Sequence, residues 1–335
     1  MASAAVWAEQ AWAQRDDHAS VASHATSSST INLSTPGQYV QVAIASPTAA
    51  PPLHPTAPGR DEPPPPAQRK GQICEEFWER LPNLSWAQCE TAQLQPSDGH
   101  SVHGRPIYVR DVAPAPNVPQ RLRVLIIGGI HGDELSAASV PMHWIQFAQE
   151  EPQRGVLWRF IPALNPDGLF DKPARRMNAH GVDLNRNFPT PNWAYDATYY
   201  WTVRTRKDPR RYPGPEPLSE PETRYLFDEI ERFRPHLIVS VHAPYGVLDF
   251  DGPLEPPRKL GRLDLDLLGI FPGSLGHYAG VYRGIPVVTV ELVSANLTPR
   301  DVEIRQMWDD MHKWMDVKLA SVNAMTEEVP PRQRH

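Results

Sequence analysis

The sequence predicts an α/β protein in which a sheet carries helices on both faces. Short apolar runs alternate along the chain with longer amphipathic stretches, which is the order of elements in this class. The runs are rich in Val, Ile and Leu and lack polar alternation, as is typical of strands buried on both faces. The four expected strands are 122–127, 156–164, 237–241 and 285–292.

The chain before these strands is expected to hold a broken helix and an edge strand. Residues 73–94 have amphipathic spacing, but Pro82 should interrupt the helix because proline removes a backbone donor and clashes with the preceding turn. A turn and a strand at the edge of the sheet are expected within 100–112.

Three helices are expected between and after the buried strands. Residues 134–149 and 220–233 have helical spacing. The second helix has Ser219 as its candidate N-cap and Glu222 three residues later, which is the order of a capping box. A final helix is expected over 308–319.

Composition excludes several classes of protein. The chain has 335 residues and a formal net charge of −6, so no nucleic-acid-binding surface is predicted. No apolar run approaches the ~20 residues that span a bilayer, so no membrane span is expected. Cys74 and Cys89 are too few for a disulfide scaffold or a four-cysteine zinc site. A reducing compartment is the simplest interpretation, and the sequence leaves open whether the two cysteines pair.

Proline separates the first 70 residues from the rest of the chain. Proline accounts for 38 of 335 residues, and a dense group of them lies between Pro47 and Pro66 after a Ser/Thr/Ala-rich stretch. Such a composition buries too little apolar surface to offset the entropy of ordering, so residues 1–70 are predicted to be disordered. No signal peptide is evident, which favours a cytoplasmic location. Residues 71–325 are expected to form one folded domain, followed by a disordered tail at 326–335.

Polar side chains suited to metal binding or proton transfer lie at the ends of all four expected strands. His131 and Glu134 follow the first strand, an Asn-Pro-Asp-Gly segment ends the second, His242 follows the third, and Glu291 lies near the end of the fourth. In open α/β sheets, ligands bind at the carboxyl ends of the strands. These groups are therefore expected to meet at one edge of the sheet.

His131, Glu134 and His242 form a candidate zinc site. Taken separately, each has a commoner explanation, because an HxxE match is usually a surface pair and a strand-end histidine is usually a core residue. Taken together, they have the composition of a catalytic zinc site with a fourth position open for water. Two neutral imidazoles and one carboxylate leave a charge of about +1 on the ion, which acidifies water and polarises a carbonyl.

Hydrolysis also needs a base, and Glu291 is the candidate. Without the other residues, a glutamate at the edge of a sheet is more simply explained by a salt bridge. An ionisable group after a largely apolar strand must nevertheless be paired or lie solvated in a cleft. Beside a metal, such a glutamate can act first as a general base and then as a general acid.

The segment 175–189 is dense in arginine and asparagine. It is either a solvated polar loop or a binding loop in which an apolar anchor lies between Arg176 and Arg186. Arginine binds carboxylates through two parallel hydrogen bonds, and asparagine adds amide donors. Together with a hydrolytic metal, the second interpretation predicts an enzyme that acts next to a free carboxylate.

These segments resemble the zinc carboxypeptidase family and, within it, the bacterial murein peptide amidase group. The resemblance covers essentially all of residues 99–295, with the motifs in the same order. The matching stretches are 129–134, 165–168, 176–189, 220–223, 240–242, 272–274 and 290–291.

The resemblance implies a mixed, mostly parallel twisted sheet and one Zn²⁺ per chain. It also implies a small peptide substrate with a free carboxylate, cut at the γ-D-glutamyl–meso-diaminopimelate amide bond during peptidoglycan recycling. It implies no oligomeric state. Carried over position by position, it implies zinc ligands at His131, Glu134 and His242, a general base at Glu291, carbonyl polarisation by Arg176, and a carboxylate clamp of Asn185 and Arg186.

Two positions depart from the family pattern. Carboxypeptidases place a mobile tyrosine over the substrate, whereas the matching positions here are Ile270 and Phe271. His180 replaces an asparagine, which could alter the wall of the pocket. The tyrosines that could take the missing place are Tyr245, Tyr278 and Tyr282.

Two alternatives remain beside the amidase hypothesis. One is another zinc hydrolase, either a general carboxypeptidase or a deacylase that releases an N-acyl amino acid, because such enzymes share the metal set and the Asn-Arg pair. The other is a binding protein that retains the metal without catalysis, and the presence of Glu291 argues against it.

Overall fold

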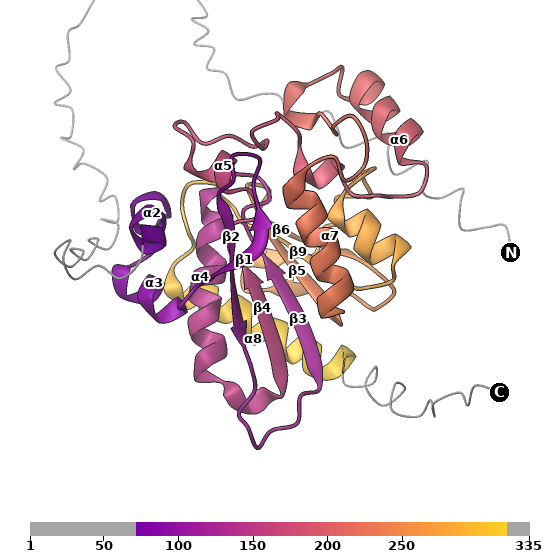
Figure 1. The fold of residues 1–335 in the computed structure, drawn as a ribbon. Helices are drawn as coiled ribbons and strands as arrows, with labels where there is room; N and C mark the ends of the chain where they lie inside the picture. Colours follow the sequence, from indigo (N-terminus) through magenta and orange to yellow (C-terminus); the bar gives the residue numbers. More distant parts are fainter. Residues whose placement is uncertain (1–71, 320–335) are drawn as a thin grey trace, which may run out of the picture. The chain divides into compact units, whose positions relative to one another are not determined.

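A seven-stranded mixed sheet forms the centre of the protein (Figure 1). The computed structural model describes residues 72–319, so the predicted disordered segments 1–70 and 326–335 lie outside the described residues. The strand order is β1-β2-β4-β3-β5-β9-β6, and the four strands β4, β3, β5 and β9 run parallel. The strands are β1 (Gln95–His100), β2 (Pro106–Val112), β3 (Leu122–Ile127), β4 (Val156–Ile161), β5 (Leu237–His242), β6 (Val247–Asp251) and β9 (Val287–Glu291).

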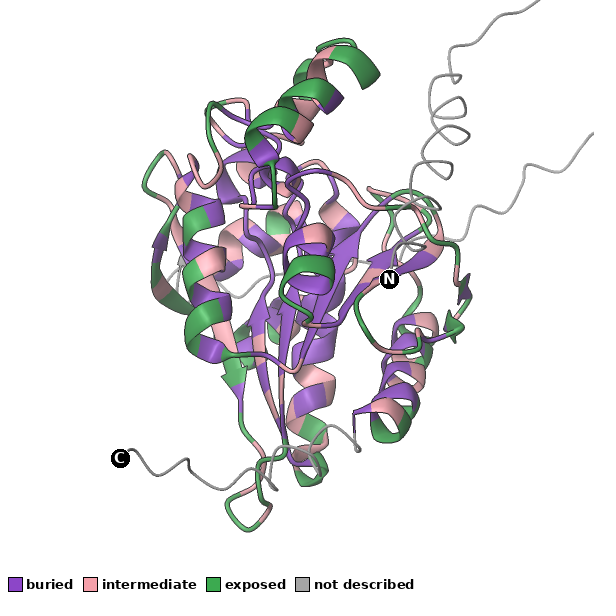
Figure 2. Cartoon of the chain, turned by 90° about the vertical axis from the view of Figure 1, so that its right-hand side faces the viewer, coloured by how far each residue is buried: buried purple, intermediate pink, exposed green. Residues whose placement is uncertain are grey.

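Helices cover both faces of this sheet, which confirms the predicted fold class. One face packs against α4 and α8, and the other packs against α7 and the π-helix η7. Figure 2 shows the strands buried between these layers. The main helices are α2 (Gln72–Arg80), α3 (Trp86–Ala92), α4 (Leu135–Glu150), α5 (Pro166–Phe170), α6 (Trp193–Tyr199), α7 (Pro221–Phe233), α8 (Asp301–Lys318) and η7 (Gly276–Tyr282).

Short elements complete the described chain. A small hairpin forms apart from the main sheet, and brief helical turns link the larger elements. These are β7 (Lys259–Leu260), β8 (Leu263–Asp264), η3 (Pro152–Arg154), η4 (Leu184–Arg186), η5 (Tyr200–Arg204) and η6 (Pro209–Arg211).

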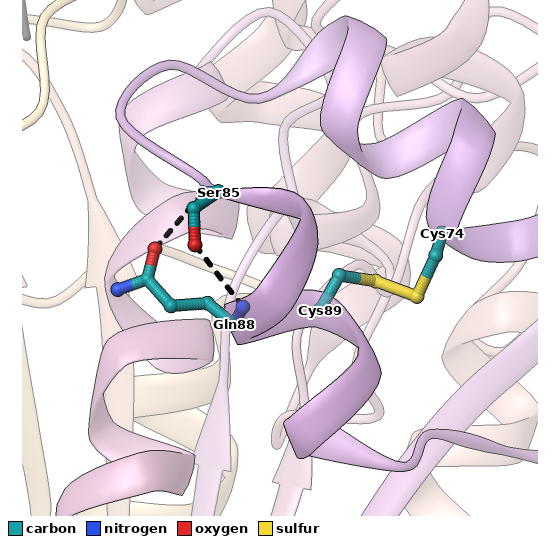
Figure 3. Close-up of a disulfide and its surroundings, with 4 residues drawn as sticks. All are labelled: Cys74, Ser85, Gln88 and Cys89. Atoms are coloured by element: carbon teal, nitrogen blue, oxygen red, sulfur yellow. Dashed lines mark hydrogen bonds between the residues drawn. A yellow bond between two sulfur atoms is a disulfide. The ribbon is translucent and has the colours of Figure 1, made fainter. Parts of the chain in front are cut away.

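The N-terminal helical segment breaks where proline predicts. Helix α2 ends at Arg80 and α3 begins at Trp86, so Pro82 lies in the interruption. Ser85 and Gln88 form a capping box at the start of α3, because each side chain accepts a hydrogen bond from the other residue's backbone N–H (Figure 3).

Cys74 on α2 and Cys89 on α3 form a disulfide (Figure 3). The pairing that the sequence left open is therefore made. Disulfides of this kind are typical of oxidising compartments, so the bond does not fit the simpler interpretation of a reducing one.

Three local predictions are wrong. Strand β2 is not an edge strand, because β1 pairs with it on the outer side. Strand β1 was hidden because its sequence, QPSDGH, has almost no apolar residues. Ser219 does not cap α7: Glu220 is the N-cap, and the Ser219 hydroxyl donates to the Glu220 carboxylate instead. Helix α8 begins at Asp301, seven residues before the predicted start, because its first two turns are mainly polar.

A buried histidine in the α8 layer makes the stability of the fold depend on pH. The His312 ring packs edge-on against the rings of both Trp158 and Trp308, with centroid distances of 5.3 and 4.6 Å. Burial lowers the pKa of His312 to about 4. Between pH 6.5 and pH 4 the unfolded chain takes up a proton at this site that the folded chain does not, so stability falls as the pH falls through this window.

We expect the His312 contribution to the free energy of unfolding to fall by up to about 2 kcal/mol between pH 7.5 and pH 5. The variant His312→Phe keeps a ring in the cluster and removes the titrating group. Urea unfolding of both proteins at both pH values measures the effect. Equal losses in the two proteins would show that His312 is not responsible.

Candidate active site

The carboxyl ends of three parallel strands bring the predicted residues together. His131 follows β3, whereas His242 and Glu291 are the last residues of β5 and β9 and are direct register partners. Glu134 is the N-cap of α4, one residue before the helix starts. Topology thus places residues that are up to 160 positions apart in the sequence at one edge of the sheet.

The loop before α4 turns sharply enough to aim both His131 and Glu134 at one point. Gly129 has φ +58°, a conformation that favours glycine. Gly132 lies against the backbone of the 165–168 segment, where an added Cβ would come within 2.2 Å of the Gly168 carbonyl carbon. Gly129 and Gly132 therefore allow the loop before α4 to turn sharply and to lie close against the backbone of the 165–168 segment.

The side chains of His131, Glu134 and His242 point their possible metal-ligand atoms at one another. The Nδ1 atom of His131 lies 2.8 Å from Glu134 Oε1, and the Nδ1 atom of His242 lies 3.0 Å from Glu134 Oε2. The two Nδ1 atoms are 3.2 Å apart, and all three side chains are buried. Two ring nitrogens this close cannot both carry a proton without repulsion, whereas a shared cation suits them. Zinc binds four ligand atoms in a tetrahedron, with bonds of ~2.0–2.2 Å. The ligand atoms around such an ion are separated by distances similar to those between the nitrogen and oxygen atoms here, so the residues fit a zinc ion.

The charges in this cluster favour an ionised Glu134. Burial opposes its ionisation, but His131 and His242 outweigh burial and hold the pKa of Glu134 well below its usual range. The backbone N–H of Ala243 also donates to Glu134 Oε2, at 3.2 Å. Glu134 is therefore held as a carboxylate, the form that binds a metal.

Asp183 is a part of the site that sequence reasoning missed. It is fully buried, and its Oδ1 lies 3.0 Å from Nε2 of His131, on the ring edge opposite the cluster. Arg176 donates to Asp183 Oδ2 through Nη2 at 2.9 Å and Nε at 3.1 Å. A carboxylate behind a metal-binding histidine fixes its tautomer and ring orientation. The signal was present, because Asp183 lies in the polar 175–189 segment, but spacing alone does not pair it with His131.

Arg176 lies beside the cluster, as the sequence led us to expect. Its Nη1 lies 3.5 Å from Glu134 Oε1, and its side chain is 12% exposed. The two bonds to Asp183 fix the plane of the guanidinium. This leaves Arg176 oriented at the edge of the site, with a charge that can face a bound carbonyl.

Arg186 is a buried cation without an ion-pair partner among residues 72–319. It is 4% exposed, and its Nε has no hydrogen-bond partner there. Its guanidinium lies 4.7 Å from the Phe271 ring centroid and 5.5 Å from that of Tyr200. Burial lowers the pKa of Arg186, although Asp183 opposes the shift. A buried guanidinium that lies against two aromatic rings is suited to an anion from outside the chain.

Asn185 and the surrounding loop are fixed by hydrogen bonds. Asn185 Oδ1 accepts from the backbone N–H of Leu275 at 2.8 Å, which leaves the amide NH₂ to donate. The loop is anchored at the buried Glu220, which accepts from Asn178 and lies 2.8 Å from Nδ1 of His180. The His180 side chain is 58% exposed. His180 therefore contacts Glu220 from the solvent-exposed side of the loop.

The three tyrosines named from the sequence differ in how well they could take the place of the tyrosine that carboxypeptidases put over the substrate. Tyr278 is buried in the core and stacks on Phe188, so it cannot cover a substrate. Tyr282 is 59% exposed at the end of η7. Tyr245 is 52% exposed, and its backbone N–H donates to the Glu291 carboxylate, which makes it the candidate nearest the site. Tyr200, beside Arg186, was not singled out from the sequence.

Glu291 is buried and incompletely satisfied. It is 7% exposed, and its Oε2 has no hydrogen-bond partner in the described chain. Burial raises the pKa of Glu291 to about 7, although His242 opposes the shift. A carboxyl group with a pKa near neutrality can both accept and return a proton.

A mixed sheet with a His-Glu-His cluster, a buried glutamate and an arginine-lined loop at its edge defines a metallopeptidase or amidase. Residues 89–249 match the profile described as zinc carboxypeptidase. The chain belongs to the zinc carboxypeptidase family, as the sequence motifs predicted.

Relatives place this chain near amidases of the family. Murein peptide amidase A of Vibrio campbellii is 35% identical over 212 residues, covering 60% of this chain and 81% of the relative. Murein peptide amidase A of Escherichia coli K12 is 35% identical over 153 residues, covering 45% and 60% respectively. The crystal structure of carboxypeptidase A from Helicoverpa armigera shares the fold, with a TM-score of 0.52, 17% identity and 68% of each chain covered.

The family and the sheet confirm the predicted fold class and the predicted enzyme class. The family is zinc-dependent, and the His131–Glu134–His242 cluster could hold such an ion. Within residues 72–319, no helix is long and apolar enough to cross a membrane.

Proposed function

We propose that this enzyme hydrolyses the amide bond between the γ-carboxyl of D-glutamate and meso-diaminopimelate in murein peptides. The observation that carries the proposal is the buried Arg186, which has no ion pair within residues 72–319 and lies in the same loop as Asp183, the partner of His131. It suits a substrate whose leaving residue keeps a free carboxylate. The relatives named murein peptide amidase A support the choice of bond.

In this proposal His131, Glu134 and His242 hold one zinc ion. When bound, this ion would polarise the carbonyl group of the substrate and make a water molecule more acidic. Glu291 takes the proton of the attacking water. As the water oxygen bonds to the carbonyl carbon and the C–N bond breaks, Glu291 returns a proton to the leaving amine. Arg176 stabilises the negative charge that develops on the carbonyl oxygen.

Asn185 and Arg186 are proposed to hold the carboxylate of the leaving residue. The guanidinium can form two parallel hydrogen bonds with it, and the Asn185 amide can donate a further one. The rings of Phe271 and Tyr200 restrict the guanidinium and lower the local polarity. The clamp thereby sets the position of the scissile bond relative to Glu291.

A substrate panel tests the proposed bond. The purified enzyme is given L-Ala-γ-D-Glu-meso-diaminopimelate, an α-linked peptide with the same leaving residue, and an N-acetyl amino acid, and kcat/KM is measured for each. We expect the γ-linked peptide to be preferred by at least about tenfold. A preference for the α-linked peptide would favour a general carboxypeptidase, and one for the acetylated amino acid would favour a deacylase.

The cytoplasmic location expected from the sequence stays a prediction. The Cys74–Cys89 disulfide is a feature more common in oxidising compartments, so it favours testing the location directly. Fractionation of cells that produce the full chain would answer this question without reference to the substrate.

The contact between Asp183 and His131 predicts a loss of metal affinity in Asp183→Asn. Loss of the buried carboxylate removes the group that orients the His131 ring, and such changes weaken metal binding by roughly 10- to 100-fold. Competition with a zinc chelator measures the affinity. Asp316→Asn, at an exposed position on α8, is the matched control. Equal zinc affinity of Asp183→Asn and the wild type would contradict the proposed role.

A further inference from the structure

An exposed ridge of aromatic and basic side chains lies beside the site. It comprises residues 193–212, which include α6, η5 and η6. In Figure 1, α6 stands apart from the helices that cover the sheet, and the helix that projects at the same height in Figure 2 is largely exposed. Within α6 and η5, only Trp193, Ala197 and Tyr200 are buried, so the ridge presents most of its side chains to solvent.

One side of the ridge carries a row of exposed apolar surface. Tyr195, Tyr199 and Val203 are four residues apart and are 71%, 47% and 54% exposed. Helical residues at this spacing are neighbours on the same side. The rings of Tyr195 and Tyr199 are stacked, with centroids 6.0 Å apart and an angle of 15° between their planes. Two aromatic faces open to water favour a partner with flat, partly apolar faces, because contact with it removes apolar surface from water.

The turn that follows this row is strongly basic. Residues 193–212 hold five basic and two acidic side chains, a net charge of +3 in a chain whose formal net charge is −6. Arg206 and Lys207 are exposed and form no ion pair within residues 72–319. Both have a positive φ, of 53° and 59°, which costs free energy in residues that carry a Cβ atom. Backbone strain of this kind is concentrated at functional sites, and here it holds two adjacent cations in solvent.

Hydrogen bonds attach the ridge to the site. Arg210 Nη2 donates to Asp133 Oδ2 at 2.8 Å, in the loop that carries two of the candidate zinc ligands. The backbone carbonyl of Tyr212 accepts from the N–H of Asp183, also at 2.8 Å. A large molecule held on the ridge can therefore extend into the site.

We propose that the ridge binds polymeric murein while the site cleaves a peptide attached to that polymer. The inference rests on the proposed function and deepens it, because it names the form of the substrate. The sugar rings of a glycan strand have flat faces of C–H groups, which pack on Tyr195 and Tyr199. The carboxylates of the attached peptides are complementary in charge to Arg206 and Lys207. A free tripeptide has no sugar ring, so its cleavage does not need the ridge.

The side chains of the ridge suit this polymer better than a lipid surface. Helices that lie in a membrane interface insert Trp, Phe or Leu side chains, whereas the exposed row consists of two tyrosines and one valine. Polymeric murein lies outside the cytoplasm, in the kind of compartment in which disulfides such as Cys74–Cys89 form.

Sedimentation with purified murein sacculi tests the binding. All proteins carry Glu291→Gln, so that the polymer stays intact. We expect Tyr195→Ala/Tyr199→Ala and Arg206→Ala/Lys207→Ala each to weaken binding by roughly 3- to 10-fold, and the second difference to vanish at high salt. Tyr195→Phe/Tyr199→Phe keeps both ring faces and should bind as tightly as the parent protein.

Cleavage assays with Glu291 intact separate the ridge from the site. Both alanine variants should cleave free L-Ala-γ-D-Glu-meso-diaminopimelate with the wild-type kcat/KM. They should release diaminopimelate more slowly, by a factor similar to the loss of binding, from sacculi whose peptides end at that residue. The matched control is Arg258→Ala/Lys259→Ala, which removes two adjacent exposed cations at the start of β7 and should equal the wild type in every assay.

Equal sacculus binding by the parent protein and both alanine variants would overturn the murein-binding ridge and leave the proposed function standing. Tighter binding to phosphatidylglycerol vesicles than to sacculi would also overturn it, in favour of a lipid surface. If the wild type cleaves no murein peptide but the alanine variants lose sacculus binding, the ridge stands and the proposed function fails.

Discussion

Replacing Glu291 with Gln is expected to lower kcat by roughly 10²- to 10⁴-fold while zinc content stays the same. Glutamine keeps the shape of the side chain but cannot take a proton from water. Glu291 is the register partner of His242, and it is not one of the three converging donors of the cluster. Proton transfer should therefore be lost without loss of the metal, and steady-state kinetics together with metal analysis measures both quantities.

Glu231→Gln provides a matched control, because this carboxylate lies on the surface in an ion pair with Arg283. Its kcat should equal that of the wild type. A Glu291→Gln enzyme with near-wild-type kcat would show that another group serves as the base. A variant that loses zinc would show that Glu291 supports the metal site instead.

Replacing Arg186 with Ala is expected to raise KM and to lower kcat/KM by about 100-fold or more, as expected when a buried, charge-assisted clamp is removed. The loss should depend on the substrate. A peptide whose terminal carboxylate is converted to an amide has nothing for the clamp to bind, so the wild type and the variant should cleave it at similar, low rates. Measuring kcat/KM for both peptides with both enzymes isolates the interaction.

Two further variants test whether the loss of activity in Arg186→Ala comes from the carboxylate clamp. Arg186→Lys keeps the charge but loses the two-bond geometry, and it should recover only part of the activity. Arg262→Ala removes an exposed arginine and should leave both peptides unaffected. If the wild type cleaved the amide as fast as the free acid, the carboxylate clamp would be wrong.

The buried parts of the fold were predictable from sequence because burial leaves a strong pattern. The central strands appear as apolar runs, and their shared direction places His242 and Glu291 at one edge. Strand β1 escaped prediction because an edge strand can be polar. Strand β6 also escaped, because Asp249 and Asp251 break its apolar pattern, and these are the residues that give it a polar face.

Residues that support a site residue were harder to predict from the sequence than the candidate zinc ligands themselves. His131 and Glu134 are three positions apart, so their spacing carries a signal. Asp183 contacts His131 across 52 positions, and Tyr200 lies over Arg186 only because η5 folds back on the loop. Such pairings depend on tertiary packing, which a single sequence does not reveal. The disulfide was likewise beyond spacing alone, because two cysteines 15 residues apart pair only if their helices meet.

The most direct test of the proposed activity is the release of free diaminopimelate. Zinc-loaded protein is incubated with L-Ala-γ-D-Glu-meso-diaminopimelate, and the products are identified by mass spectrometry, with Glu291→Gln prepared in parallel to detect contaminating enzymes. We predict that the wild type releases diaminopimelate and L-Ala-D-Glu and that the variant does not. Intact tripeptide after incubation with the zinc-replete wild type would contradict the amidase assignment.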